Sequence, residues 1–346
     1  MTVNETAPVG IDVDRVCAWV SRHLPELPAL QRDSVTVRML DGGRSNLTYH
    51  VTDGTHGWVL RRPPLGKVLT TAHDMVREHT MLDVIARTGI PVPTSYGVCD
   101  DPAINGSTFQ IMEFVEGTVY RSRAQLADAG PPRARAISAR MVDTLAALHN
   151  VDVRTGTLQR IGRPDGYLVR QLRRWTEQFA AADMHDMRPA AQLRAQLLRT
   201  PPPRSRAGVV HGDYRLDNLI IDSADRLAAV LDWEMATVGD PLLDVALLLI
   251  YQRLVAEYPQ APMPNASSAP GFLTETQIVR RYEQQTGAPL TGFEWHLALA
   301  SYKLAAILAG VAHRHARGQV VGPGFEGIGD LVHPVLLSGL RILRKV

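Results

Sequence analysis

The sequence predicts an α+β chain of two lobes, a small one built on an antiparallel sheet with one main helix and a large one that is mainly helical. Two observations carry this prediction. Short β-like runs surround a single convincing helix in the first 115 residues, and long helical stretches dominate after Gly117. We therefore expect an N-terminal lobe at residues 1–113 and a C-terminal lobe at residues 114–346.

The elements of the first lobe follow from local patterns. Apolar residues at helical spacing predict a helix over 11–24, which Pro25 ends. A second helix is expected over 72–89, with Gly89 as its stop and one buried face made of Met75, His79, Leu82, Ile85 and Ala86. Runs of β-formers predict strands at 35–40, 46–52, 56–62, 95–100 and 108–115.

The second lobe begins with a long predicted helix at 133–151, and an Arg-rich, largely helical stretch follows at 160–206. Short apolar runs at 209–210, 219–221 and 227–231 predict strands, the last two joined as a hairpin by the turn "DSADR". Helices are expected from there to the end, among them a buried amphipathic helix within 295–312.

Composition narrows the class of protein. The 346 residues are 45% hydrophobic and 21% charged, and the formal net charge is +2. These values are ordinary for a globular protein and indicate neither a nucleic-acid partner nor a membrane partner. Residues 1–10 have no basic and apolar signal pattern, and Cys17 and Cys99 form no disulfide framework. We expect a cytoplasmic protein; the sequence does not indicate its oligomeric state.

Polar residues cluster unusually in "VVHGDYRLDNLIID", residues 209–222. Asp213 precedes Asn218 by five residues, and Asp232 in "LDWE" follows fourteen residues later, after the predicted hairpin. That hairpin would bring Asn218 and Asp232 to the same end. A carboxylate and an amide oxygen suit Mg²⁺, and Asp213 could accept a proton from a hydroxyl nucleophile. Phosphoryl transfer needs this set, with Arg215 placed to offset charge on the γ-phosphate.

The pattern H-G-D-x-x-x-x-N followed by an apolar-Asp-Trp segment resembles the aminoglycoside phosphotransferase-like family, which has the bilobal protein-kinase-like fold. The resemblance runs over about residues 35–320. It implies an ATP-dependent kinase in which Asp213 is the catalytic base, and Asn218 and Asp232 bind Mg²⁺. It also implies that Asp244 hydrogen-bonds the catalytic loop and that His211 supports this loop. We expect Asp240 to be a turn or N-cap residue.

The same resemblance implies a nucleotide site in the small lobe. "DGGRSNLTYHV" (41–51) occupies the place of the glycine-rich turn, where backbone N–H groups of Gly43, Arg44, Ser45 and Asn46 would meet phosphate oxygens. Arg61 stands where the family has its phosphate-binding Lys, although Arg62 or Lys67 could serve instead. Glu78 is then the helix carboxylate that pairs with this cation.

The segment "IMEFVEG" (111–117) resembles the hinge that connects the lobes. Backbone groups of Glu113 and Val115 would then meet the adenine edge, with Met112 behind it. Sequence alone does not choose between ATP and GTP as the phosphate donor.

The phosphate acceptor is the least determined feature. Residues 160–206 hold ten Arg against four acids, among them Arg170, Arg173 and Arg174 on neighbouring helical positions. They form either a solvated face or an anion site for a carboxylate or phosphate group. "LRRPPLG" and "LDWEMATVGDPLLDVA" resemble most the kinase-like domain found with some acyl-CoA dehydrogenases, which implies a hydroxyacyl or hydroxy-acid substrate. An antibiotic-modifying enzyme, a kinase for another hydroxylated metabolite and a nucleotide-binding pseudokinase are the alternatives; H-G-D and D-W-E disfavour a protein kinase.

Overall fold

The computed structural model describes residues 9–40, 46–65, 74–182, 184, 187–200, 202, 206–318 and 326–344. The chain divides into two compact units, Met1–Gly117 with Ala228–Glu234, and Thr118–Leu227 with Met235–Val346. The first unit thus takes in a short segment that comes late in the sequence. The Val230 N–H joins this segment to the first unit by donating to the Pro91 carbonyl at 2.8 Å.

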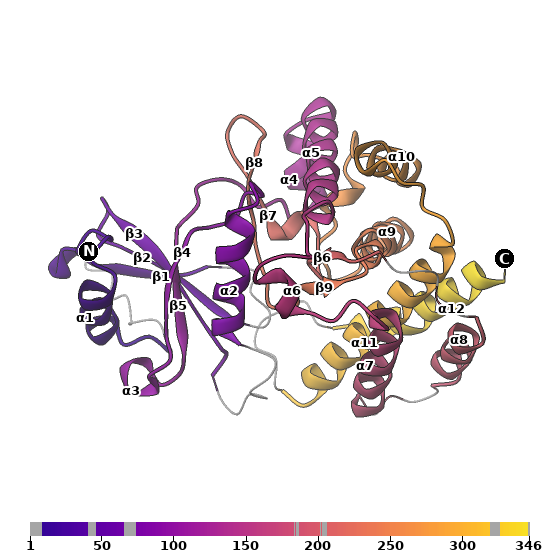
Figure 1. Ribbon diagram of the computed structural model, residues 1–346, viewed down its shortest axis with the longest axis horizontal. Coiled ribbons are helices and arrows are strands. Elements are labelled where there is room, and N and C mark those ends of the chain that lie inside the picture. The colour runs from indigo at the N-terminus through magenta and orange to yellow at the C-terminus, as the bar shows by residue number, and fades with distance from the viewer. Residues whose placement is uncertain are drawn as a thin grey trace. The chain divides into compact units, whose positions relative to one another are not determined.

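The first unit is built on a five-stranded antiparallel sheet in the order β1-β2-β3-β5-β4 (Figure 1). Every strand falls within a run that the sequence predicts. The strands are β1 (Thr36–Met39), β2 (Leu47–Thr52), β3 (Gly57–Arg62), β4 (Ser95–Cys99) and β5 (Phe109–Met112). The helical elements are α1 (Val13–His23), η1 (Arg32–Ser34), α2 (Met75–Ala86) and α3 (Pro102–Asn105).

The two faces of this sheet have different roles. Neighbouring residues along a strand point to opposite faces, and the register pairs Tyr49 with Leu60 and Thr48 with Arg61. Tyr49 and Leu60 belong to a fully buried core together with Val16 and Val20 of α1. Arg61 therefore lies on the face opposite to this core.

Helix α2 differs from its prediction in the face that it buries. Asp74 caps its first turn by accepting from the Arg77 N–H at 3.0 Å. The expected face included His79 and Ala86, but His79 is half-buried and Ala86 is exposed. The buried residues are Met75, Glu78, Met81, Leu82 and Ile85. The face is rotated because Glu78, a charged residue, is buried by pairing with a cation.

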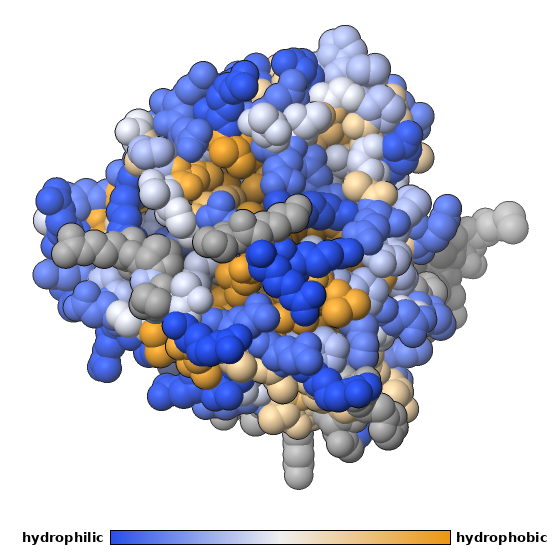
Figure 2. All heavy atoms as spheres, turned by 90° about the vertical axis from the view of Figure 1, so that its right-hand side faces the viewer, coloured by the Kyte–Doolittle hydropathy of each residue, from blue (hydrophilic) through white to orange (hydrophobic). Residues whose placement is uncertain are grey.

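The second unit is mainly helical. Its helices are α4 (Arg123–Asp128), α5 (Pro131–His149), α6 (Leu158–Ile161), α7 (Tyr167–Ala181), α8 (Arg188–Arg199), α9 (Leu242–Glu257), α10 (Glu275–Thr286), α11 (Phe293–Ala316) and α12 (Val332–Leu343), with 3₁₀ turns η2 (Leu216–Asn218), η3 (Ala266–Ser268) and η4 (Ile328–Leu331). Figure 2 views the molecule from the side of α8, α10 and α12. Hydrophilic residues cover most of that face, and hydrophobic ones show in its recesses.

Short strands frame the loop that carries Asp213. β6 (Gly208–Val210) precedes it and pairs with β9 (Thr237–Gly239), a strand that the sequence analysis missed. β7 (Leu219–Ile221) follows the loop and pairs with β8 (Leu227–Val230), as the predicted hairpin requires.

Helix α11 forms much of the core of the second unit. It is long and apolar enough to cross a membrane, but 78% of its most apolar 18-residue stretch is buried inside the structure. The predicted buried helix at 295–312 lies within it. Its single lysine, Lys303, is buried as well.

Candidate active site

The loop between β6 and η2 presents Asp213 through a tight turn at Gly212. Gly212 has φ +90°, and a Cβ atom there would lie 2.8 Å from the Cβ of Met235. Only glycine fits without strain under both conditions. The H-G-D sequence thus fixes the backbone direction in front of Asp213.

Asp244, in the first turn of α9, holds this loop through hydrogen bonds to its backbone. Its carboxylate accepts the His211 N–H at 2.6 Å and the Gly212 N–H at 2.8 Å. Burial alone would raise the pKa of Asp244, but the contacts with His149 and the charge of Lys303 lower it. The buried carboxylate therefore stays ionised, and the contact predicted between Asp244 and the catalytic loop is present.

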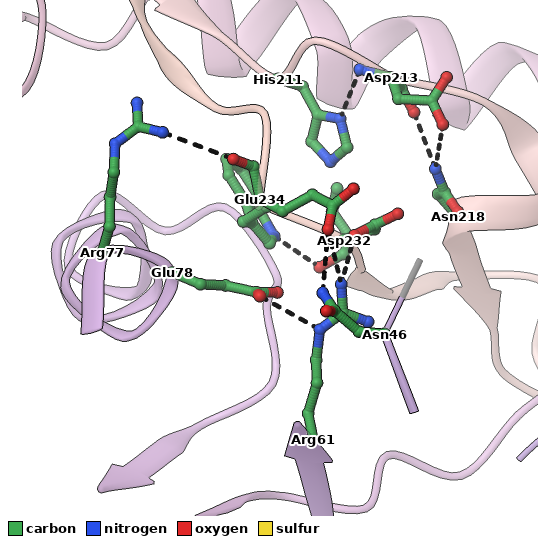
Figure 3. Close-up of polar contacts among 11 residues, drawn as sticks. Asn46, Arg61, Arg77, Glu78, His211, Asp213, Asn218, Asp232 and Glu234 are labelled. Atoms are coloured by element: carbon green, nitrogen blue, oxygen red, sulfur yellow. Dashed lines mark hydrogen bonds and ion pairs between the residues drawn. The ribbon is translucent and has the colours of Figure 1, made fainter. Parts of the chain in front are cut away.

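Asp213 and Asn218 are brought together within this loop (Figure 3). The Asn218 amide Nδ2 donates to the Asp213 carbonyl at 2.9 Å and to its carboxylate Oδ2 at 3.2 Å. The Asp213 N–H donates to Nδ1 of His211 at 3.2 Å, which agrees with the supporting role predicted for His211. The amide nitrogen of Asn218 is used on Asp213, so its oxygen is the atom left for a cation.

Arg215 has a different environment from the predicted one. Its guanidinium binds the Asp217 carboxylate in a bidentate pair at 2.9 and 2.6 Å, and it lies 4.2 Å from the centre of the Tyr251 ring. To meet a γ-phosphate, Arg215 would have to leave Asp217, so that role stays a prediction. The sequence left Asp217 without a role, and this pair supplies one.

In the first unit, Arg61 lies at the centre of a cluster of three carboxylates (Figure 3). Its Nε donates to Glu78 at 3.1 Å and its Nη2 to Asp232 at 2.5 Å, with Glu234 at 3.9 Å. Burial would lower the pKa of Arg61, but these carboxylates raise it above its usual value. Burial raises the pKa of Glu78, and Arg61 opposes that shift. Arg61 therefore makes the pairing with the helix carboxylate that the resemblance assigns to a Lys.

The other two candidates for this cation are placed differently. Arg62 points to the opposite side of β3, where its guanidinium donates to the backbone carbonyls of Gly10, Pro63 and Asn105. Lys67 lies outside the described residues, as do Gly43, Arg44 and Ser45 of the predicted glycine-rich turn. Among the described residues, Arg61 is the cation paired with Glu78.

Glu234 is a site residue that the sequence analysis missed. Its carboxylate accepts from the Asn46 Nδ2 at 2.9 Å, and its carbonyl accepts from Arg77 at 3.4 Å. Asn46 is almost fully buried. Next to this contact, Asp232 has φ +66°, a left-handed backbone that is uncommon for a residue with a side chain. Such strain is typical of functional positions.

The predicted hinge, residues 111–117, begins in the last two residues of β5 and continues beyond the strand. The Glu113 N–H donates to the Thr94 carbonyl at 2.8 Å, and the Glu113 carboxylate accepts from the Thr94 hydroxyl at 2.8 Å. The Glu113 N–H is therefore occupied, and only its carbonyl can serve an adenine edge. Val115 is half-buried. Phe114 between them stacks on His50 of β2 with ring centres 3.7 Å apart.

Asp240 contacts the beginning of helix α9 and also a buried histidine. One carboxylate oxygen accepts the Leu242 N–H at 3.0 Å, as an N-terminal cap would. The other lies 2.9 Å from Nε2 of His296, and both side chains are about 1% exposed. No local pattern predicts this partner, because His296 is 56 positions away in the chain.

The Arg-rich helix α7 gives little support to an anion site. Arg170 donates to the backbone carbonyls of Arg163 and Asp165, and Arg173 lies 3.8 Å from Glu177. Arg174 is exposed and lies 5.4 Å from the centre of the Trp175 ring. Arg170 and Arg173 thus make local contacts.

The residues assigned to Mg²⁺ are suitable oxygen donors. Asn218 belongs to the second unit and Asp232 to the first. Across the described parts of the chain, no group of three or more His, Cys, Asp or Glu side chains could hold a metal ion. Mg²⁺ at phosphate sites needs only one or two carboxylates, because phosphate and water oxygens complete its shell. By the chemistry of its side-chain oxygen, each of the two residues therefore suits a metal that arrives with a nucleotide.

Comparison with known proteins assigns the family. The model of the phosphotransferase enzyme family (APH) matches residues 36–275. Human acyl-CoA dehydrogenase family member 11 is 30% identical over 332 residues, covering 95% of this chain and 42% of the human protein. The chain thus spans about two fifths of that relative.

Solved structures agree on the fold. A candidate aminoglycoside phosphotransferase from Ralstonia eutropha is 30% identical with a TM-score of 0.81, covering 97% of this chain and 99% of that one. A thermostable mutant of aminoglycoside phosphotransferase APH(4)-Ia, solved with AMP-PNP and hygromycin B, is 16% identical with a TM-score of 0.61, covering 93% and 98%. The predicted α+β, protein-kinase-like fold is confirmed. The chain belongs to the APH phosphotransferase family of small-molecule kinases and is related to the kinase-like region of acyl-CoA dehydrogenase family members 10 and 11.

Proposed function

We propose that the protein is an Mg²⁺-dependent kinase that transfers the γ-phosphate of ATP to a hydroxyl group of a small hydroxyacyl compound. The observation that carries this proposal is the fixed geometry of Asp213. Two backbone N–H groups before it are held by the buried Asp244, and its carboxylate accepts from the Asn218 amide. Such preorganisation is what a base needs to orient a hydroxyl nucleophile.

The proposed reaction balances simply. The substrate hydroxyl oxygen forms a bond to the γ-phosphorus, the bond from that phosphorus to the bridging oxygen of ADP breaks, and the hydroxyl proton passes to the Asp213 carboxylate. Asn218 and Asp232 would hold Mg²⁺, which supplies charge neutralisation on the phosphates. Arg61, kept in place by Glu78, would bind phosphate oxygens. The Gly43–Asn46 turn and the Glu113–Val115 hinge are proposed to hold the phosphates and the adenine.

The acceptor class rests on the relatives. Human acyl-CoA dehydrogenase family member 11 and mouse family member 10 both match this chain, which covers 42% and 28% of their lengths. A kinase joined to such an enzyme would most simply act on an acyl compound that carries a hydroxyl group. Arg174, which is exposed, is available to an anionic substrate.

A screen of acceptors tests this proposal. ATP consumption with Mg²⁺ is measured against hydroxyacyl-CoAs, free hydroxy acids and aminoglycosides at equal concentration, with the matching non-hydroxylated acyl-CoAs as controls. We expect turnover with a hydroxyacyl compound and none with its control. Turnover with aminoglycosides alone would assign an antibiotic-modifying enzyme instead. Binding of AMP-PNP without turnover on any acceptor or on water would favour a pseudokinase.

A further inference from the structure

Lys303 is one of three lysines in the chain, and it is 2% exposed in the apolar helix α11. Its Nζ donates to the Gly212 carbonyl at 2.5 Å. A lysine is almost never fully buried without a charged or polar partner, because removing an ammonium group from water is costly. The partner here is the backbone directly before the proposed base.

This contact fixes one particular peptide group. The peptide bond from Gly212 to Asp213 has its carbonyl held by Lys303 and its N–H held by Nδ1 of His211 at 3.2 Å. The preceding peptide has its N–H held by Asp244 at 2.8 Å. Gly212 has φ +90° and lacks a side chain, so these contacts supply the restraint that a Cβ atom would otherwise add.

We propose that Lys303 is a positioning residue for Asp213: it holds the Gly212–Asp213 peptide so that the Asp213 carboxylate faces the hydroxyl nucleophile. This inference rests on the proposed function, in which Asp213 is the base. The hydrogen bond of Lys303 goes to the main chain, so it acts through Asp213 and is not itself a catalytic residue.

The protonation state of Lys303 depends on its burial and on its charged neighbours. Asp244 of α9 and Asp213 of the loop favour the ammonium form, whereas burial and Arg174 of α7 disfavour it. The Nζ also lies 5.3 Å from the centre of the Trp175 ring. Burial is the strongest of these effects and lowers the pKa of Lys303 to about 8. Lys303 therefore changes from a charged to a neutral donor near pH 8, where enzyme activity can be assayed.

Two variants and one control test the role. Lys303→Met removes the donor, and Lys303→Arg keeps the charge. The control Ser301→Ala changes a buried residue of the same helix whose hydroxyl donates to the Leu297 carbonyl at 2.9 Å. The assay is Mg²⁺-dependent hydrolysis of ATP, in which water takes the place of the unidentified acceptor, together with the dissociation constant of AMP-PNP.

We expect Lys303→Met to lower kcat on the order of 10²-fold, as a misplaced catalytic group does. AMP-PNP binding should stay unchanged, Ser301→Ala should resemble the wild type, and Lys303→Arg should retain part of the rate. Wild-type kcat should also fall above a pH of about 8, because a neutral donor makes a weaker hydrogen bond than a charged one, and Lys303→Met should lack that limb. A wild-type rate and pH profile in Lys303→Met would overturn the inference.

A second measurement keeps the inference testable where turnover is slow or a variant folds poorly. Protein labelled with ¹³Cε-lysine should give only three lysine signals, and Lys303→Arg assigns the one from Lys303. Asp213→Asn should lower the pKa of Lys303 further, because one of its two favourable carboxylates is lost. If the pKa of Lys303 is the same in Asp213→Asn as in the wild type, the contact is contradicted. If Asp213→Asn retains turnover, the proposed function fails; if it abolishes turnover and Lys303→Met does not, only this inference fails.

Discussion

The Arg61–Glu78 pair makes a quantitative prediction about the first unit. Arg61→Met leaves the Glu78 carboxylate, whose side chain is 2% exposed, without its cation. Removing one partner of a buried ion pair costs about 3–5 kcal/mol. Glu78→Gln costs less, about 1–3 kcal/mol, because Arg61 keeps Asp232 and can still donate to the Gln oxygen.

A double-mutant cycle tests this reasoning. We expect Arg61→Met with Glu78→Gln to lose less than the sum of the single changes, with a coupling of about 1–3 kcal/mol. Urea unfolding is followed together with hydrogen exchange of β3 and α2, since the two units need not unfold as one. Arg38→Met, on the exposed part of β1, is the control and should change stability little. Additive effects of the two changes would refute the pairing.

Three further predictions concern the second unit. The pKa of Lys303 falls from 10.5 to about 8, so charging this residue costs about 3 kcal/mol at neutral pH. Because the unfolded chain keeps that proton between pH 8 and 10.5, wild-type stability should rise with pH in this window relative to Lys303→Met, as chemical unfolding across pH measures. Asp244→Asn should cost about 1–3 kcal/mol in urea unfolding, because one loop N–H loses its acceptor. Asp217→Ala should free Arg215; if Arg215 serves the γ-phosphate, AMP-PNP binding tightens, and if it does not, binding stays unchanged.

The sequence predicted the elements well where local chemistry decides them. The strands of the first sheet have strong β-propensity, and each one lies within a predicted run. The spacing of Asp213, Asn218 and Asp232 predicted a candidate site, and the family resemblance added Asp244 as the residue that holds the loop. β9 was missed because three residues form a strand only when β6 lies beside them.

Other features depend on contacts that no local pattern carries. Lys303 meets a backbone carbonyl 91 positions away, and His296 meets Asp240 at a separation of 56. Glu78 was predicted to pair with the cation through the family resemblance alone, because the apolar pattern of its helix left it off the buried face. Its burial follows only from the position of Arg61 on the neighbouring strand. Similarly, the role predicted for Arg215 did not account for Asp217 two residues later.

Transfer of labelled γ-phosphate by Asp213→Asn tests the central claim most directly. The variant should bind AMP-PNP as the wild type does, since Asp213 is not proposed to hold the nucleotide. Phosphate transfer to the acceptor found in the screen should fall on the order of 10²- to 10⁴-fold, the usual contribution of a general base. Transfer at the wild-type rate with intact nucleotide binding would contradict the account.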